Sequence, residues 1–418
     1  MKIYEVGGAV RDSLLGLEPK DIDYVVVGSN PTELVSLGFT QVGSSFPVFL
    51  HPTTNEEYAL ARTEKKIGTG YHGFECEWEN VTLEQDLQRR DITINAIAYD
   101  VHKEEYIDPY FGIQDLEHKI IRHCNNKSFT EDPLRILRVA RFTAKLPDFT
   151  VYHGTIKLIK ETELEHLTPE RITLETDKAL MCDKPSNYFR FLLDNGKLET
   201  LFPILYRMTQ LEHRSAWHIE GSVFEHTMLV IDEASKLPNK NLKIMYGALY
   251  HDIGKTQAYE EFEHKNGFHG HEDIDITRPL CGELKKTYKL PNDISRVIQY
   301  CSTYHSFLFS LLDKEMKVST IVKKLCNGTF PKTEEDIDIL FSVSISDNKG
   351  RITKNPYILP SNDYLQNLIG LCASMNKVSA KGYISKYKEE NEGKEPKLEA
   401  IKQYLHRERI HKFSKSFT

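Results

Sequence analysis

The sequence is poor in cysteine, and its cysteines form none of the usual structural motifs. Seven cysteines are scattered over 418 residues, and no Cys-x-x-Cys pair occurs. This pattern argues against a disulfide framework and against a zinc finger. The chain also lacks an apolar run near the ~20 residues that a membrane-spanning helix needs, and it begins without the apolar segment of a signal peptide. We therefore expect a cytoplasmic protein that does not interact with membranes.

An excess of positive charge is absent as well. The formal net charge is −7, so binding of a nucleic acid would have to rest on local basic patches rather than on the overall field. Hydrophobic residues make up 40% of the chain and charged residues 28%, a balance that leaves enough apolar material for well-formed cores. The length of the chain predicts about two to four domains.

The most informative stretch lies close to the N-terminus. Residues 6–16 read VGGAVRDSLLG, and residues 20–28 read KDIDYVVVG. They predict a strand, a glycine turn, a short helix and a second strand. Asp21 and Asp23 are expected on that second strand, where alternate side chains share a face. Two neighbouring carboxylates repel each other unless a cation lies between them, and an all-oxygen pair of this kind suits Mg²⁺.

The glycine turn adds features that suit a phosphate. Because they lack side chains, Gly7 and Gly8 allow backbone N–H groups to approach a phosphate closely, and Arg11 can neutralise it with a bidentate contact. An isolated Asp-x-Asp or Gly-Gly is usually a solvated strand end or an ordinary turn. The order and spacing of all these parts together indicate metal-assisted chemistry on a nucleoside triphosphate.

This stretch resembles the first motif of the class II tRNA nucleotidyltransferases, the family of CCA-adding enzymes and bacterial poly(A) polymerases. The resemblance rests on GGAVRDSLLG followed by DID. It implies an α+β fold, in which an N-terminal polymerase-β-like head with a mixed sheet and helices precedes an all-helical neck and body. It also implies Mg²⁺ in the head, with tRNA, CTP and ATP as partners of a monomer or homodimer. In this fold a third carboxylate often faces the metal pair from a neighbouring strand. Glu57 is the candidate, although Glu56 and Glu57 could simply be solvated.

Two further segments of the head carry expectations. Residues 65–80 are rich in glycine and charge and predict a mobile loop, which is either a lid over the substrate or an ordinary surface loop. Residues 89–98 read RRDITINAIA and resemble the family's Arg-Arg-Asp-x-Thr-x-Asn-Ala motif between head and neck. That motif implies a nucleotide contact for Arg90, and we expect Asp91 to orient Arg90. On its own, the segment could be a salt-bridged corner before an apolar strand.

The second informative stretch is TEDPLRILRVARF at residues 130–142. Thr130 is expected to cap a helix there. Polar side chains then follow on the helix at three-residue steps, namely Asp132, Arg135, Arg138 and Arg141. Residues at this spacing are neighbours and form one ridge. Such a ridge is usually a surface row of ion pairs.

A more specific interpretation follows from the edges of the bases. Cytosine and adenine both present an amino donor beside a ring-nitrogen acceptor, which a carboxylate and a guanidinium would match. Uracil and guanine present the opposite pattern and would leave charged groups unpaired. In the resembled family, a Glu-Asp-x-x-Arg motif serves as such a protein template, which gives these roles to Asp132 and Arg135. Arg138 and Arg141 would hold phosphates or the geometry of the template.

The body, from residue 201 onward, reads as helical and contains a second set of candidate ligands. A His-Asp pair ends a helix just before Gly-Lys, with one histidine earlier and one aspartate later. This order resembles the HD metal-dependent phosphohydrolases and implies a divalent metal (Mg²⁺, Ni²⁺ or Mn²⁺) bound by His226, His251, Asp252 and Asp347. Further histidines that would support these ligands or contact phosphate are His269, His271 and His305. A lone histidine on an apolar helix is more often an ordinary core or surface residue.

These motifs predict five parts: a head (1–125), a neck with the base template (126–200), linking helices (201–222), an HD domain (223–350) and a helical tail that contacts tRNA (351–418). The predicted function is addition of C, C and A to tRNA 3′ ends without a nucleic-acid template. A phosphatase or 2′,3′-cyclic phosphodiesterase activity of the HD domain would accompany it. Poly(A) addition, or addition of only CC or only A, is an alternative function within the same family. A further alternative is an HD phosphohydrolase with an inactive head. A pure RNA-binding module is less well supported, because two sets of metal ligands would be unexplained.

Overall fold

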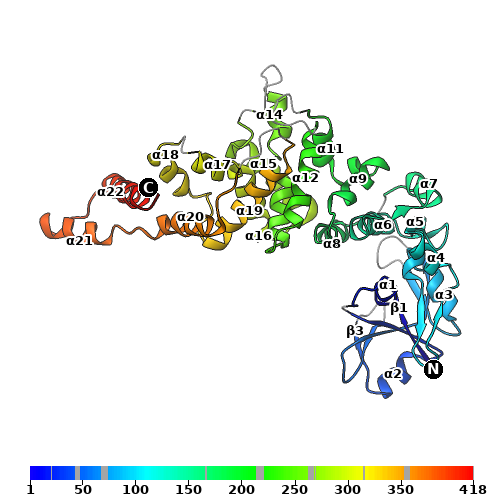
Figure 1. The fold of residues 1–418 in the computed structure, drawn as a ribbon. Coiled ribbons are helices and arrows are strands. Elements are labelled where there is room, and N and C mark those ends of the chain that lie inside the picture. The colour runs from blue at the N-terminus through cyan, green and yellow to red at the C-terminus, as the bar shows by residue number, and fades with distance from the viewer. Residues whose placement is uncertain are drawn as a thin grey trace. The chain divides into compact units, whose positions relative to one another are not determined.

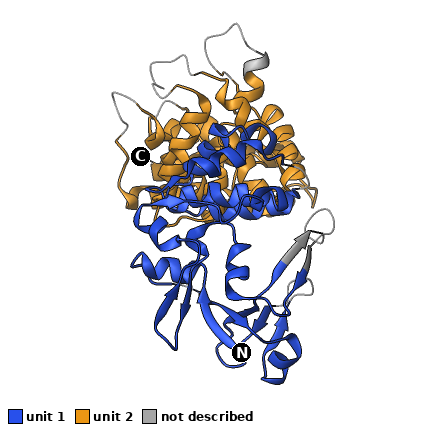
Figure 2. Ribbon diagram, turned by 90° about the vertical axis from the view of Figure 1, so that its right-hand side faces the viewer, with its two compact units in different colours: residues 1–201 blue, residues 202–418 orange. Residues whose placement is uncertain are grey.

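The computed structural model describes residues 1–418 except 20, 43–47, 67–73, 165–166, 213–220, 262–267, 269, 314–315, 353–357 and 418. The chain forms two compact units, Met1–Leu201 and Phe202–Thr418, which Figure 2 shows in separate colours. The first unit holds strands and helices, and the described elements of the second are helices (Figure 1). The α+β fold expected from the sequence is confirmed, whereas the finer division into five parts stays a prediction.

A mixed sheet forms the N-terminal part of the first unit. Within the described residues, its strand order is β3-β4-β5-β2-β1-β8-β9. The strands of this sheet are β1 (Lys2–Val6), β2 (Asp23–Val27), β3 (Thr40–Val42), β4 (Val48–Leu50), β5 (Glu57–Leu60), β8 (Ala98–Asp100) and β9 (Glu105–Ile107). Strands β2 and β5 run parallel, and the other neighbouring pairs are antiparallel. The strand that carries Asp23 therefore lies in the interior of the sheet.

Strand β2 is buried on both faces. Its sequence DYVVV has the β-branched composition that favours strands. Val25 packs into one apolar cluster with Leu87, and the next residue, Val26, packs into another with Leu34. Successive side chains of a strand point to opposite faces, so a helix covers each side of the sheet. These helices are α3 (Leu83–Gln88) and α2 (Pro31–Ser36).

The segment expected to be a mobile loop is partly a hairpin. Strands β6 (Thr63–Lys66) and β7 (Phe74–Glu77) pair antiparallel, with Thr63 opposite Glu77. The loop expectation for residues 65–80 was therefore wrong at these positions. Ladder hydrogen bonds between the two strands outweigh the weak strand preference of their charged residues. The glycine-rich centre, residues 67–73, lies outside the described residues.

Helices complete the first unit. They are α1 (Gly8–Leu14), α4 (Gly112–Glu117), α5 (Ser128–Glu131), α6 (Leu134–Lys145), α7 (His153–Glu161), α8 (Pro169–Leu180), α9 (Ser186–Asp194) and α10 (Leu198–Leu201). Three short elements lie among them: η1 (Thr93–Asn95) and the paired strands β10 (Ile120–Ile121) and β11 (Thr150–Val151). Helix α6 is amphipathic and packs against α8 and α9. It buries Leu137 and Ala140, so its arginine-bearing face is directed away from this core.

The expected cap of α6 was wrong. Thr130 lies inside the short helix α5, and α6 begins at Leu134 after Pro133. The carboxylate of Asp132 accepts a hydrogen bond from the backbone N–H of Leu134 (3.2 Å). Pro133 has no N–H to donate and readily starts a helix, so the chain breaks between two helices at Asp132. This break places the Asp132 side chain at the start of α6.

The second unit is a helical bundle. Its elements are α11 (Pro203–Thr209), α12 (Val223–Ser235), α13 (Leu242–Tyr250), α14 (Lys255–Glu261), α15 (Ile274–Tyr288), α16 (Asn292–Tyr304), α17 (Phe307–Leu312), α18 (Val318–Leu325), α19 (Glu334–Gly350), α20 (Asn362–Ser374), η2 (Met375–Lys377), α21 (Lys381–Glu390) and α22 (Leu398–Phe417). Helices α12, α13, α16 and α19 pack against one another in its centre. Ser222, Asn241 and Thr333 cap α12, α13 and α19 with their side chains. No helix in the described part of the chain is both long and apolar enough to cross a bilayer.

Candidate functional site

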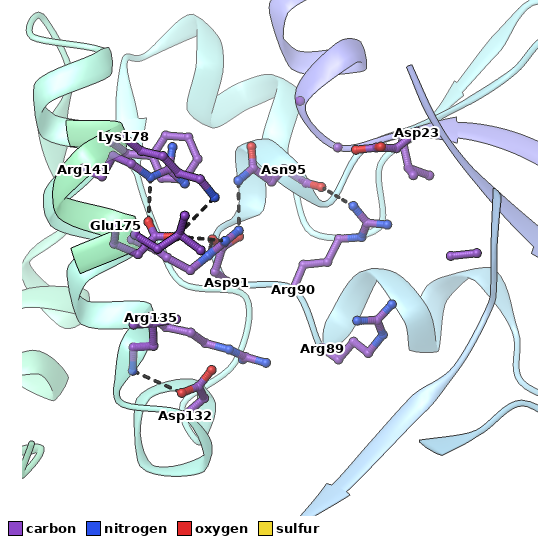
Figure 3. A pocket seen from close by; sticks show the side chains of 18 of the residues that line it. Asp23, Arg89, Arg90, Asp91, Asn95, Asp132, Arg135, Arg141, Glu175 and Lys178 are labelled. Atoms are coloured by element: carbon purple, nitrogen blue, oxygen red, sulfur yellow. Dashed lines mark hydrogen bonds and ion pairs between the residues drawn. The ribbon is translucent and has the colours of Figure 1, made fainter. Parts of the chain in front are cut away.

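A cavity of about 1210 Å³ lies in the first unit, between the sheet and helices α6 and α8 (Figure 3). Among the described residues that line it, nine are arginine or lysine and six are aspartate or glutamate. A chain with a net negative charge thus concentrates positive charge at one place. This local excess suits an anionic ligand such as a triphosphate.

Two carboxylates are neighbours at one side of the cavity. Asp23 begins β2 and Glu57 begins β5, and the parallel register makes their Cα atoms direct partners. Both side chains line the cavity. Partial burial and the charge of Glu57 raise the pKa of Asp23; Arg90 opposes this shift and Asp21 adds to it. Three of the predicted acidic residues, Asp21, Asp23 and Glu57, therefore lie close enough for their charges to interact.

The expected start of this strand was wrong. Pairing with β1 ends at Val6 opposite Asp23, because the chain turns at Gly7. Asp21 consequently has no ladder partner and lies exposed in a bend before β2. It is not among the residues that line the cavity. Its negative charge still contributes to the raised pKa of Asp23.

The glycine turn makes room for an arginine. Gly7 precedes α1 with a φ of 74°, a left-handed conformation that glycine adopts without strain. A Cβ at this position would lie 3.0 Å from Nη1 of Arg90. Gly8 follows and lines the cavity. The absence of side chains at the turn thus leaves space for the guanidinium.

Arg11 lines the cavity, but the protein already engages much of its guanidinium. The residue is 3% exposed. Its Nε donates to Asp12 (2.8 Å), and its Nη1 donates to the side-chain oxygen of Asn95. Sequence reasoning gave Asn95 no role, although the residue belongs to the Arg-Arg-Asp-x-Thr-x-Asn-Ala motif. The motif itself was the signal that could have identified it.

The expectation that Asp91 orients Arg90 was wrong. Arg90 instead donates to the buried Asp86 (3.2 Å) and to the backbone carbonyl of Asn95 (3.3 Å). Asp91 accepts from Nε of Arg138 (2.7 Å) and from Asn95 (3.2 Å). The expected apolar strand is the turn η1 followed by β8, and the side chain of Asp91 faces α6 there. Burial alone would raise the pKa of Asp91, but the Arg138 guanidinium holds it well below its usual range.

The two residues expected to read the base line the same cavity, each with a partner of its own. Asp132 accepts from Nη2 of Arg171 (2.8 Å), and Nη1 of Arg135 donates to the hydroxyl of Ser128 (2.7 Å). Figure 3 shows Asp132 and Arg135 together on one side of the pocket and Asp23 on the other. A ligand that reached both groups would have to extend across the cavity.

Glu175 contacts the two remaining arginines of the ridge, Arg138 and Arg141. Glu175 on α8 accepts from Nε of Arg141 (2.7 Å) and lies 3.9 Å from Arg138 and 3.7 Å from Lys178. Its side chain is buried, so this cluster stabilises the packing of α6 on α8. The sequence held no local signal for it, because the partners lie on different helices.

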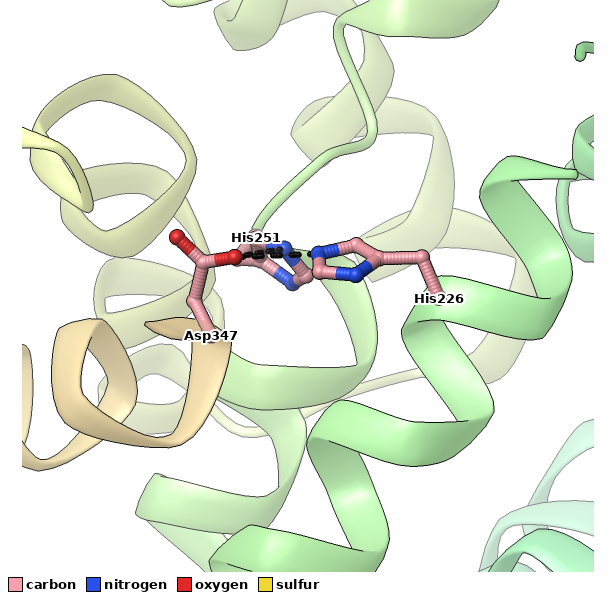
Figure 4. Close-up of side chains that lie close together, drawn as sticks. All are labelled: His226, His251 and Asp347. Atoms are coloured by element: carbon pink, nitrogen blue, oxygen red, sulfur yellow. Dashed lines mark hydrogen bonds and ion pairs between the residues drawn. The ribbon is translucent and has the colours of Figure 1, made fainter. Parts of the chain in front are cut away.

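The second unit brings three of the expected metal ligands together. His226 lies on α12, His251 follows α13 and Asp347 lies on α19; their side chains point towards one another (Figure 4). Nε2 of His226 lies 2.9 Å from Oδ1 of Asp347, and Nε2 of His251 lies 3.8 Å from the same oxygen. All three residues are buried. Helices from three separate parts of the sequence therefore converge on one point.

Asp252, the fourth expected ligand, lies between this group and two further histidines. With His271 and His305 it forms a second group whose ligand atoms lie within 4.8 Å of one another. Lys255 donates to Oδ2 of Asp252 (2.6 Å). Burial, reinforced by the charge of Lys255, lowers the pKa of His271 to about 4. His269, also expected near the ligands, lies outside the described residues.

The donor set fits a divalent cation. Imidazole nitrogens and carboxylate oxygens are typical ligands of such ions. Nε2 of His251 is buried without a hydrogen-bond partner among the described residues, and a cation would satisfy it. Burial alone would raise the pKa of Asp252 and Asp347, but neighbouring cationic groups, above all Lys255 and Arg351, hold both well below the usual range. Both carboxylates are thus ready to bind a metal at neutral pH.

Comparisons with known proteins agree with this architecture. Residues 3–122 match the model of the poly(A) polymerase head domain, and residues 148–208 match a probable RNA- and SrmB-binding site of polymerase A. The crystal structure of the Bacillus stearothermophilus CCA-adding enzyme in complex with CTP is similar, with a TM-score of 0.64 and 20% identity over 99% of this chain and 89% of that one. A CCA-adding enzyme in complex with ATP has a TM-score of 0.58 and 21% identity over 99% of this chain and 88% of that one. The first unit thus has the head fold of this class of nucleotidyltransferases.

A comparison of sequences identifies the family of the whole chain. A multifunctional CCA protein of Shewanella denitrificans is 42% identical over 393 residues, which cover 92% of this chain and 93% of the relative. The chain belongs to the family of multifunctional CCA proteins. The family expected from the first motif is thereby confirmed.

Proposed function

We propose that this protein adds C, C and A to the 3′ ends of tRNA from CTP and ATP, without a nucleic-acid template. One observation carries the proposal: a single basic cavity holds paired carboxylates at one side and an aspartate–arginine pair at the other. The carboxylates suit a cation that would bind the reacting phosphate, and the second pair suits the base. The relatives' name and the CTP- and ATP-bound structures of similar fold support this choice of substrates.

The acidic side of the cavity fits Mg²⁺. Asp23 and Glu57 are partners on adjacent strands. Burial and the charge of Glu57 raise the pKa of Asp23, and a bound cation would offset both effects. Asp21 adds a third carboxylate close by. When bound, Mg²⁺ activates the attacking 3′-hydroxyl and neutralises developing charge on the phosphates. Arg90, held beside the glycine turn, would bind the triphosphate and keep its α-phosphorus in line with the hydroxyl.

The base side of the cavity accounts for selectivity. The Asp132 carboxylate would accept from the amino group of cytosine or adenine, and Arg135 would donate to the ring nitrogen. Uracil or guanine would place an acceptor against the carboxylate. Arg138 and Arg141, fixed by Asp91 and Glu175, would keep α6 in the position that this reading requires.

Nucleotide addition to a shortened tRNA tests the proposal directly. The full chain is incubated with Mg²⁺ and a tRNA that lacks its 3′ CCA, with CTP and ATP supplied separately and together, and the products are sequenced. Addition of C, C and A followed by a stop, lost in Asp23→Ala, is the expected result. An A-only tail would indicate a poly(A) polymerase or an A-adding specialist, and addition of CC alone would indicate a CC-adding one.

A second activity is favoured by the buried His–Asp cluster of the other unit. Its ligands fit a divalent metal such as Mg²⁺, Ni²⁺ or Mn²⁺, which when bound activates water for attack on phosphorus. We propose an HD-type phosphohydrolase acting on phosphomonoesters or 2′,3′-cyclic phosphates. Hydrolysis of 2′,3′-cyclic AMP should be lost in His251→Ala and retained in Asp23→Ala. Hydrolysis without nucleotide addition in the unaltered chain would instead indicate an inactive head.

A further inference from the structure

One face of helix α6 connects the base side of the cavity with the glycine turn. Arg138, Phe142 and Lys145 follow one another at steps of four and three residues, a spacing that places them on the same face of a helix. Each of them contacts a residue near the glycine turn or in the segment before β8. Helix α6 also packs against α8 and α9, so these three side chains link that helical layer to the sheet.

The first link runs from Arg138 through two buried side chains. Nε of Arg138 donates to Oδ2 of Asp91 (2.7 Å), and the side-chain amide of Asn95 donates to Oδ1 of the same carboxylate (3.2 Å). The side-chain oxygen of Asn95 then accepts from Nη1 of Arg11. Figure 3 shows Asp91 and Asn95 next to each other. Arg138 is thus connected to the arginine that follows the glycine turn.

The second link runs from Lys145 to the same arginine. Nζ of Lys145 donates to Oδ2 of Asp12 (3.0 Å), and Nε of Arg11 donates to Oδ1 of that carboxylate (2.8 Å). Between the two links, the guanidinium of Arg11 lies 5.3 Å from the centre of the Phe142 ring, within the range of a cation–π contact. Both links therefore meet at Arg11, and α6 is attached at two points.

The two links differ in their exposure to water. The side chains of Asp12 and Lys145 are 20% and 34% exposed, whereas that of Asp91 is 5% exposed. An ion pair that water can reach is weaker than one that is shielded. The Asp12–Lys145 pair is thus the link that opens more easily, and its loss would leave the contact between Arg138 and Asp91 in place.

Two points of attachment fix the direction of a helix. Arg138 and Lys145 are seven residues apart, which corresponds to about 10 Å along the axis. Asp132 and Arg135, the residues proposed to read the base, lie on the other side of Arg138. If Lys145 were released, α6 could turn about the contact between Arg138 and Asp91. The end of the helix that reads the base would then move relative to the glycine turn.

The distance between the two sides of the cavity matters more for one nucleotide than for the other. In the proposed complex, Asp132 and Arg135 hold the edge of the base, while Arg90 and a cation at Asp23 hold the phosphates. Cytosine and adenine present the same kind of edge, but adenine has two fused rings and places its ribose further from that edge. CTP therefore requires the closer approach of the two sides.

We propose that Asp12 and Lys145 are positioning residues of nucleotide addition, whose ion pair holds α6 at the spacing that cytosine requires. Neither residue is among the described residues that line the cavity, so both act through Arg11 and α6. The inference rests on the proposed function and deepens it, because it makes the balance between CTP and ATP depend on two residues outside the cavity. Release of the pair impairs addition of C more than addition of A.

Lys145→Met tests this inference, because it removes the charge and keeps a long side chain. Single-turnover rates at saturating nucleotide are measured for addition of C to a tRNA without its CCA and of A to a tRNA that ends in CC. A misplacement of about 1 Å can cost about 100-fold in rate, and we expect a partial loss of about 10-fold for C and about 3-fold or less for A. Lys145→Arg should restore the ratio of the two rates.

Two further variants isolate the ion pair. Lys119→Met breaks an exposed pair with Asp148 in the same unit and should leave both rates unchanged. In an Asp12→Ala background, Lys145→Met should cause no further change in the ratio, because its partner is already absent. Circular dichroism checks that each variant is folded. If Lys145→Met lowers both rates by the same factor, or changes neither, the pair does not position α6 as inferred.

Binding of CTP and ATP in the absence of tRNA separates this inference from the proposed function. Equilibrium dialysis with labelled nucleotides gives both Kd values, and Lys145→Met should raise the Kd for CTP more than that for ATP. This shift in a chain that adds nothing to tRNA would support the positioning role and contradict the proposed function. Addition of C, C and A with ratios that Lys145→Met leaves unchanged would do the reverse. A chain that binds neither nucleotide would contradict both.

Discussion

Nη2 of Arg171 donates a hydrogen bond to the carboxylate of Asp132 over 2.8 Å. Arg171 lies in the first turns of α8, and Asp132 lies just before α6, so the bond joins two helices of the first unit. The aspartate proposed to read the base is thereby oriented before any nucleotide arrives. Selectivity should then depend on Arg171 as well as on the residues that touch the base.

Asp132→Ala should weaken the preference for CTP and ATP over UTP and GTP. A hydrogen bond to a charged group contributes about 1.5–3 kcal/mol, which predicts a loss of about 10- to 100-fold in selectivity. Competition assays on a tRNA without its CCA end measure the ratio of kcat/KM values. Asp148→Ala, on an exposed aspartate of the same unit, is the matched control. An unchanged ratio in Asp132→Ala would contradict the template role.

Arg171→Ala should lower selectivity less than Asp132→Ala does, because Arg171 acts on the base only by positioning the carboxylate. Arg171→Lys retains the charge but loses the planar donor geometry, so it should restore part of the selectivity. The discriminating measurement is the ratio of kcat/KM for CTP to that for UTP across the three variants. A merely structural role for Arg171 would lower both values equally and leave the ratio intact.

Asp91→Ala should destabilise the first unit by about 1.5–3 kcal/mol at neutral pH, because it removes the charged hydrogen bond between Asp91 and the partly exposed Arg138. The depressed pKa of Asp91 means that the pair contributes stability above the unfolded-state pKa and loses it as the pH falls through the folded-state pKa. The difference in unfolding free energy from the unaltered chain should therefore shrink in acid. Urea unfolding at a series of pH values measures it. A difference that is constant with pH would contradict this account.

Glu57→Gln should raise stability in the absence of Mg²⁺ and reduce the stabilisation that Mg²⁺ provides. Burial and the charge of Glu57 raise the pKa of Asp23, so both remove stability as the pH rises through the folded-state pKa, and Glu57→Gln relieves the second of them. Relieving it should raise the Tm at neutral pH in the presence of a chelator. Nucleotide addition and the Mg²⁺-dependent rise in Tm should both decrease, because one candidate ligand is gone. If the chelated variant is no more stable than the unaltered chain, the two carboxylates do not repel each other as inferred.

Gly254→Ala should impair the second unit selectively. The added Cβ would lie 1.9 Å from the carbonyl oxygen of His271, so the two segments must separate. Mn²⁺ binding in this unit and hydrolysis of 2′,3′-cyclic AMP should fall, while CTP addition in the first unit continues. Gly282→Ala is the matched control, because nothing lies within 4 Å of its added Cβ. Equal effects of both variants would show that the close approach is unimportant.

Local patterns in the sequence were sufficient for the parts of the fold that depend on neighbouring residues. The first strand, the glycine turn, the short helix after it and the second strand follow from residue types a few positions apart. The bond between Arg138 and Asp91 joins residues 47 positions apart, and the bond between Arg171 and Asp132 joins residues 39 apart. Neither pattern is visible in the local sequence. Tertiary packing decided these partners and also moved the start of β2 from Asp21 to Asp23.

The histidines clustered around Asp252 also affect how quickly a metal can be captured. Nδ1 of His251, of His271 and of His305 lies within hydrogen-bond distance of a backbone carbonyl three or four residues earlier in the chain. The folding of the local backbone therefore sets the ring orientation before an ion enters. Little conformational entropy remains to be lost on binding, so metal association in this unit should proceed without a slow rearrangement of the protein.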